Sequence, residues 1–150
     1  MAVVTAVCIS DEKGVQKHAV QEVLVRKNIG IEGDAHAGAG RRQISLLCEE
    51  SVEKLKPFIP DLPPGAFAEN ILTRGIALYE LSVGTRLRIG ETLLEVSQVG
   101  KQCHRDCAIK LMTGDCVMPR EGVFAVALAE GTIRAGDTVE IVAPGQACAF

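Results

Sequence analysis

Short alternating strands that follow glycine turns are the feature that most constrains this fold. Val83–Ile89 reads VGTRLRI and Ala135–Ile141 reads AGDTVEI, so the two segments resemble each other. In each segment a Gly turn leads into an alternating strand with one buried face. After the first segment, a second Gly turn leads into another strand, Leu93–Val99. A series of such strands is typical of a barrel rather than an open parallel sheet. We predict a mainly β fold: a closed or nearly closed β-barrel with a few short helices.

Composition indicates an aliphatic core in one domain. The chain has 150 residues, of which 47% are hydrophobic, 3% are aromatic and none is Trp, so Val, Leu, Ile and Ala must fill the core. β-branched residues among these favour strands. A chain of this length buries about 68–70% of the surface that its unfolded form exposes. We predict a single domain over residues 1–143 and a flexible tail of small residues over 144–150.

Local patterns place the other elements. Val3–Ile9 and Ala19–Val25 are predicted to form an N-terminal hairpin, and Gln43–Leu47 another strand. Glu49–Leu55 has the acidic first turn and the apolar spacing of a short helix, which the prolines of Pro57–Gly65 stop. These patterns add one short helix to the expected barrel.

Charge and hydropathy argue against two classes of partner. A net charge of -3 provides no global field for attracting nucleic acid or an anionic membrane. There is no apolar run near the roughly 20 residues that span a bilayer, and Met1–Ser10 is typical of a strand rather than a signal peptide. We expect a cytoplasmic protein whose six cysteines are reduced, which leaves metal binding or thiol chemistry as options.

The stretch Gly100–Gly122 concentrates the candidate chemistry. Cys103 and Cys107 follow a predicted strand directly, and strand ends often carry reactive groups. Four basic residues surround these thiols: Lys101, His104, Arg105 and Lys110. Positive charge favours the thiolate, which can attack sulfur or bind a soft metal. We predict that Cys103 or Cys107 is functional.

The other cysteines have different surroundings. Cys8 and Cys48 lie in apolar, strand-like runs, and free Cys is among the most buried residue types, so we assign both to the core. Cys116 fits either role. A zinc site built from Cys103, His104, Cys107 and Cys116 is a weaker alternative, because the C-x3-C spacing lacks the paired C-x2-C knuckles of structural zinc sites.

Two further segments suit anion binding. Arg120 lies in a turn rich in Gly and Pro, and Arg recognises phosphate or carboxylate through two parallel hydrogen bonds, although a salt bridge to a neighbouring acidic residue is an equally simple role. Asp34 and His36 lie in a Gly-rich segment whose composition suits an exposed loop, and Arg41 and Arg42 follow it. Taken alone, each segment is weak evidence of a site.

Six segments taken together resemble the MOSC domain, the C-terminal domain of molybdenum cofactor sulfurases, in its small stand-alone bacterial form. In chain order the segments are Gly30–Gly38, Gln43–Leu47, Phe67–Ile71, Val83–Thr85, Gly100–His104 and Met118–Phe124. The resemblance runs from about Val3 to Val142, and it is specific because several motifs agree in order. It implies a β-barrel fold with a few helices and an association with the molybdenum cofactor, molybdopterin.

The resemblance also implies roles for particular residues. A reactive cysteine, Cys103 as first choice or Cys107, would carry sulfur as a persulfide, and Cys103 is also the candidate molybdenum ligand. The residues implied to line the pocket are Asp34, His36, Asn70 and Arg120. The basic residues implied to meet the pterin phosphate include Arg42, Lys101 and His104.

The sequence departs from the larger members of the family. It shows no pyridoxal phosphate-dependent desulfurase domain, so the resemblance implies a separate cysteine desulfurase as sulfur donor. A molybdoenzyme or a cofactor-biosynthesis protein would be the acceptor. The alternatives that stay open are a pterin- or metal-binding module without turnover and, less favoured, a structural zinc domain.

Overall fold

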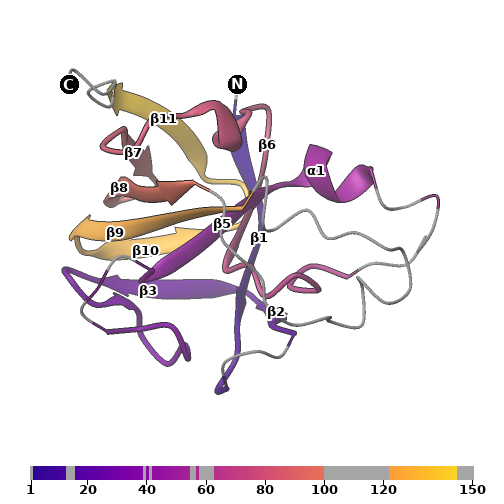
Figure 1. The fold of residues 1–150 in the computed structure, drawn as a ribbon. Helices are drawn as coiled ribbons and strands as arrows, with labels where there is room; N and C mark the ends of the chain where they lie inside the picture. The colour runs from indigo at the N-terminus through magenta and orange to yellow at the C-terminus, as the bar shows by residue number, and fades with distance from the viewer. Residues whose placement is uncertain are drawn as a thin grey trace.

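The computed structural model describes residues 2–12, 16–38, 40, 42–54, 57, 63–99 and 122–144. Figure 1 shows the arrangement of the elements. The strands are β1 (Ala2–Ile9), β2 (His18–Val20), β3 (Glu22–Arg26), β4 (Gly30–Ile31), β5 (Ile44–Cys48), β6 (Ile71–Arg74), β7 (Arg86–Ile89), β8 (Thr92–Val99), β9 (Val123–Ala129), β10 (Gly131–Arg134) and β11 (Thr138–Ala143). The helices among these residues are α1 (Glu49–Glu53) and a 3-10 turn, η1 (Leu78–Glu80).

Seven strands close into a barrel in the order β1-β11-β7-β8-β9-β5-β6 and back to β1. Closure depends on the pairing of β1 with β11, in which Ala2 lies opposite Val139. The barrel pairs are antiparallel except for β5 and β6, which run parallel with Leu46 beside Ile71. β2 adds to β1, and a small second sheet has the order β10-β3-β4. The predicted barrel is confirmed.

The barrel interior is aliphatic. Side chains that point inward include the fully buried Leu46, Ile71, Leu87 and Leu94, and no described member of this cluster is aromatic. Burying one such side chain contributes about 1.5–3 kcal/mol relative to leaving it exposed. The interior therefore matches the core that the composition predicted.

A second apolar cluster covers part of the outer face. In β1, β5 and β6 the residues that alternate with the interior set belong to this cluster, for example Cys8, Leu47 and Leu72. Val52 of α1 and Phe67 pack over them. Cys8 and Cys48 are both buried free thiols, which confirms their assignment to the core.

Two predicted elements can be compared with the structure directly. The strand predicted over Ala19–Val25 is divided at Gln21: β2 pairs with β1, whereas β3 pairs with β10 in the second sheet. The simple hairpin was therefore wrong for its second half, because local alternation does not show a change of partner. The predicted helix is confirmed as α1, which Arg74 fastens to the barrel through Glu49 and Glu53.

Two other predictions stay open. The tail is outside the described residues from 145 onward, so its flexibility and the domain boundary remain predictions. Among the described residues, no helix has the length and apolar character required to cross a membrane.

Candidate functional site

One row of side chains crosses the outer face of the barrel and links the predicted site residues. The row consists of Cys8, Asn70, Ser45, Phe124 and Gln98, which are neighbours on successive strands or on the residue preceding a strand. We call it the outer row. Its Cys8 end meets a cluster of buried charges, and its Gln98 end meets an exposed arginine.

Asn70 lies fully buried in the outer row, between Cys8 and Ser45. Its Oδ1 accepts hydrogen bonds from the backbone N (3.0 Å) and the Oγ (3.1 Å) of Ser45, and its Nδ2 donates to the carbonyl of Cys8 (3.0 Å). The side chain therefore links β1 to β5 across the start of β6. Its predicted part in lining a pocket remains a prediction.

A buried ion pair lies beyond the Cys8 end. Lys17 Nζ is 2.8 Å from Asp34 Oδ1, and neither side chain is exposed to solvent. Lys17 Nζ also donates to Ser10 Oγ (3.1 Å), and the Ser10 backbone N donates to Asp34 Oδ1 (3.1 Å). Such hydrogen bonds offset the desolvation of the two charges. The segment around Asp34, expected to be an exposed loop, is thus anchored by a buried carboxylate.

His36 stands beside this ion pair. Its backbone N donates to Asp34 Oδ2 (3.0 Å), and its Nδ1 lies 3.6 Å from the same oxygen, too far for a normal hydrogen bond. The side chain is 22% exposed, and Nδ1 has no hydrogen-bond partner among the described residues. The structure therefore brings the predicted Asp34 and His36 together, with the ring of His36 at the boundary between the buried pair and solvent.

The surroundings of Asp34 keep it ionised. Burial alone would raise the pKa of this carboxyl group, but hydrogen bonds from His36, Lys17 and Ser10 outweigh burial and hold the pKa well below its usual range. The negative charge of Asp34 therefore persists at neutral pH opposite Lys17. Lys17 and Ser10 were not predictable as members of this cluster, because nothing in their local pattern marks a buried polar residue.

Glu69 holds the turn of its own loop, which contacts the same region through the hydrogen bond from the Lys17 N to the Gly65 carbonyl. Its Oε2 accepts from the Gly65 backbone N (2.9 Å) and its Oε1 from the Phe67 backbone N (3.0 Å). Burial raises the pKa of Glu69, and these N–H groups together with Lys17 oppose that rise in part. Gly65, at φ +89°, must be glycine, because a Cβ there would lie 2.2 Å from the carbonyl oxygen of Lys17.

The thiol of Cys8 is unreactive. Burial, and secondarily the charge of Glu69, raise the pKa of its thiol to about 12, although Lys17 lowers it in part. At physiological pH the group is therefore a neutral thiol, which is a poor nucleophile and a poor metal ligand. Thiol chemistry in this protein must use other cysteines.

Arg42 stands at the Gln98 end of the outer row, exposed just before β5. Its Nε donates to Gln98 Oε1 (3.2 Å), and its guanidinium carbon lies 5.4 Å from the centroid of the Phe124 ring. Both contacts orient the side chain. Its two terminal nitrogens make no hydrogen bond to any residue within the described ranges, so they remain available to an anion.

The remaining predicted site residues lie outside the described residues: Lys101, Cys103, His104, Cys107 and Arg120. The residues that border the segment are described, and Val99 pairs with Val123 where β8 ends and β9 begins. Within the described ranges there is no group of three His, Cys, Asp or Glu side chains that could hold a metal ion. The four residues weighed for zinc all fall in the undescribed segment.

Sequence comparison decides the family. The family model of the MOSC domain matches residues 32–140, which is most of the chain and includes Asp34, His36, Arg42 and Asn70. The chain belongs to the MOSC domain family. This family is associated with the molybdenum cofactor. Comparison with curated proteins gave no significant match.

Solved structures share the MOSC fold of this chain. YuaD from Bacillus subtilis superposes with a TM-score of 0.75 at 19% identity, over 93% of this chain and 94% of that chain. YiiM from Geobacillus stearothermophilus gives 0.69 at 19% identity, over 95% of this chain and 76% of that one. YiiM from Escherichia coli superposes with a TM-score of 0.63 at 21% identity, over 95% of this chain and 68% of that chain. At these identities the likeness concerns the fold.

Proposed function

We propose that this MOSC domain binds the molybdenum cofactor in the cytoplasm and carries sulfur for it on a cysteine of the segment between β8 and β9. The observation that carries the proposal is the position of Arg42. Gln98, which orients Arg42, is the residue before Val99, and Val99 borders the segment that contains Cys103 and Cys107. The side chain of Arg42, which precedes β5, is therefore held at the end of β8, next to the residue that borders the thiol-bearing segment.

The residues fit the chemistry of the cofactor. Its phosphate suits the planar fork of Arg42, with Lys101, His104 and Arg120 as further cations in the sequence. Its molybdenum suits a soft thiolate ligand, for which Cys103 is the first choice and Cys107 the second. When bound, the cofactor supplies a metal centre that accepts sulfur.

Sulfur loading requires a separate donor. A cysteine thiolate of this chain attacks the terminal sulfur of a cysteine desulfurase persulfide; a new S–S bond forms, and the desulfurase leaves as its own thiolate. The electrons balance without an added oxidant. A molybdoenzyme or a cofactor-biosynthesis protein is the proposed acceptor of the sulfur.

Mass spectrometry of the intact protein tests this function. The protein is incubated with a cysteine desulfurase and cysteine, and the mass of one added sulfur is sought in the wild type, in Cys103→Ser, in Cys107→Ser and in the double variant. We expect the double variant to fold and to lose the adduct, while the matched control Cys48→Ala keeps it. An adduct that persists in the double variant would exclude Cys103 and Cys107 as the cysteines that carry the sulfur.

A second candidate function is a cofactor-binding module without sulfur transfer. The orientation of Arg42 favours it, because that anion contact needs no thiol. It predicts that protein from a cofactor-producing host retains pterin and molybdenum but never acquires a persulfide. Metal analysis of the same sample also tests the zinc alternative, which predicts stoichiometric zinc and unfolding by a chelator.

A further inference from the structure

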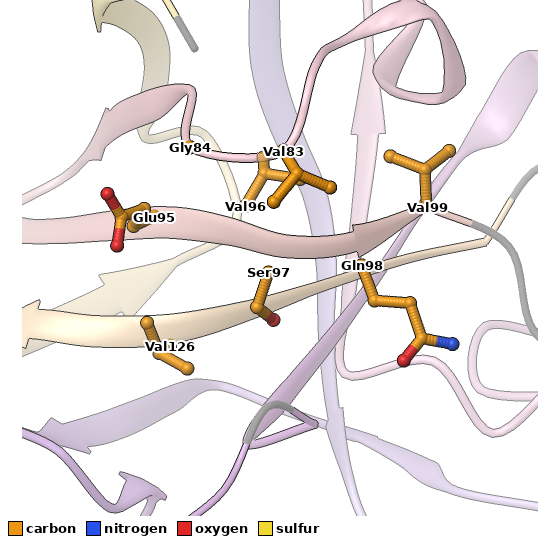
Figure 2. A pocket seen from close by; sticks show the side chains of 8 residues that line it. All are labelled: Val83, Gly84, Glu95, Val96, Ser97, Gln98, Val99 and Val126. Atoms are coloured by element: carbon orange, nitrogen blue, oxygen red, sulfur yellow. The ribbon is translucent and has the colours of Figure 1, made fainter. Parts of the chain in front are cut away.

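An open hollow of about 580 Å³ lies on the outer face of the barrel along β8. Figure 2 shows its lining, with Val83 and Val99 on one side of β8 and Val126 on the neighbouring strand. Glu95 and Gln98 also line it. Cavities of roughly 300–1,000 Å³ with apolar walls and a few polar groups are typical of small-molecule sites.

The walls of the hollow are built into the sheet. The Gly84 N donates to the Val96 carbonyl (2.8 Å), and the Val96 N donates to the Thr85 carbonyl (2.8 Å), which fixes the Val83 wall against β8. Val83 remains 54% exposed, so folding leaves this large apolar side chain unburied. A preformed apolar wall reduces the ordering that a ligand must impose.

Charged groups border the hollow on both sides. Gln98 lines it and also accepts the hydrogen bond from Arg42, so the oriented guanidinium lies next to it. Glu95 lines it too, and its Oε1 lies 3.6 Å from Nε of Arg86. Glu95 is thus paired with Arg86. Arg42, in contrast, contacts the neutral side chains of Gln98 and Phe124 and pairs with no carboxylate among the described residues, so the cation beside the hollow favours an anionic ligand.

The apolar surface is local rather than extended. Of the exposed large hydrophobic residues described, which are Leu24, Ile29, Val83, Ile141 and Val142, only Val83 lines the hollow. A stable protein partner buries about 800 Å² on each side. A concave site with a single protruding valine suits a small molecule better than a second protein.

We propose that this hollow binds a small organic anion, whose apolar body packs against Val83, Val99 and Val126 and whose anionic group contacts Arg42. Because Val99 is the last described residue before the cysteine segment, the ligand would lie where that segment begins. The site shares Arg42 with the proposed cofactor contact, but it requires neither a metal nor a thiol, so its test is separate from the test of sulfur carriage.

Two fluorescent probes separate the apolar contribution from the anionic one. The probes are 1-anilinonaphthalene-8-sulfonate and its uncharged analogue N-phenyl-1-naphthylamine, and the chain has no Trp whose emission would interfere. We expect Val83→Asp to abolish binding of the sulfonate. We expect Arg42→Gln to lower the affinity for the sulfonate by roughly three- to tenfold, because one charge-assisted contact is lost. The affinity for the neutral probe should not change.

Matched variants and a map of the binding site complete the test. Leu24→Asp removes an exposed apolar residue from β3 and Arg134→Gln an exposed arginine from β10, and neither is expected to change binding. Amide chemical shifts should change at Ser97 and Val126, which also line the hollow. All measurements use metal-free protein with Cys103→Ser and Cys107→Ser, so their outcome is independent of sulfur carriage.

Three results would overturn the proposal. The first is sulfonate binding that is insensitive to both Val83→Asp and Arg42→Gln. The second is shift changes confined to other strands. The third is reversible self-association that Val83→Asp abolishes, because this would assign the hollow to a second copy of the chain.

Discussion

The two ends of the outer row hold charge in opposite ways. At the Cys8 end, Lys17 and Asp34 are fully buried and hydrogen-bonded to each other and to Ser10. At the Gln98 end, Arg42 is exposed and held by Gln98 and Phe124, and its terminal nitrogens make no hydrogen bond to the described residues. The buried charges therefore stabilise the loops, whereas the oriented cation that no described carboxylate neutralises is where we propose that a ligand binds.

The largest expected effect comes from breaking the buried pair. Lys17→Met leaves the carboxylate of Asp34 buried without its cation, and we expect a loss of about 3–5 kcal/mol in the free energy of unfolding. Urea denaturation measures it. The double variant Lys17→Met/Asp34→Asn should recover part of the loss, because it removes the unpaired charge and keeps an acceptor for a backbone N–H group of Ser10 or His36. A single-variant loss below about 1 kcal/mol would contradict the structural role of the pair.

Glu69→Gln tests the second buried carboxyl group at that end. The amide retains one acceptor for two backbone N–H groups, so one buried donor loses its partner. We expect a loss of about 1–3 kcal/mol, measured by the same denaturation. Glu32→Gln, at an exposed ion pair with Arg26, is the matched control and should change stability by less than about 1 kcal/mol. Equal losses in the free energy of unfolding of the two variants would contradict the prediction that the buried carboxylate stabilises the protein more than the exposed one.

The pH dependence of stability sharpens the comparison further. The pKa of Asp34 is lower in the folded than in the unfolded protein, so its contribution is complete above the unfolded value of about 4 and is lost as the pH falls towards the folded value. The slope should be about 1.4 kcal/mol per pH unit for this one proton. Denaturation between pH 2 and pH 7 measures it.

The control for that experiment is Asp34→Asn, which should reduce the fall in the free energy of unfolding at acidic pH. Glu69 acts in the opposite direction: its raised pKa makes its contribution decline as the pH rises from about 4.3 towards the folded value. The Asp34 slope is therefore best measured in a Glu69→Gln background. If the free energy of unfolding of Asp34→Asn fell at acidic pH as steeply as that of the parent protein, other carboxyl groups would be responsible for the loss.

The smallest effect on stability is expected at the exposed end. Arg42→Gln removes a surface cation, and we expect the free energy of unfolding to change by less than about 0.5 kcal/mol. Thermal denaturation checks this, and the sulfonate affinity of the same variant should nevertheless fall. A loss of stability comparable to that of Lys17→Met would show that Arg42 also has a structural role, and it would contradict the difference between the two ends of the outer row.

Much of the architecture was predictable from local patterns. The alternation around Leu87 and Val139 predicts strands with one buried face, the aliphatic composition predicts the interior, and the apolar surroundings of Cys8 and Cys48 in the sequence predict their place in the core. The ordered motifs predicted the MOSC family, which the family comparison confirmed. Asp34 and His36 were predicted as site residues, and the structure places them side by side.

Tertiary structure alone decided which polar groups meet. Lys17 reaches Asp34 because the pairing of β1 with β2 returns the chain beside Ser10, and no local period marks that lysine as buried. The hollow arises because β8 continues to Val99 while β7 begins only at Arg86. The sequence by itself determined which faces are apolar, since side-chain periodicity is local; strand pairing determined the ion pair and the hollow, since both depend on residues far apart in the chain.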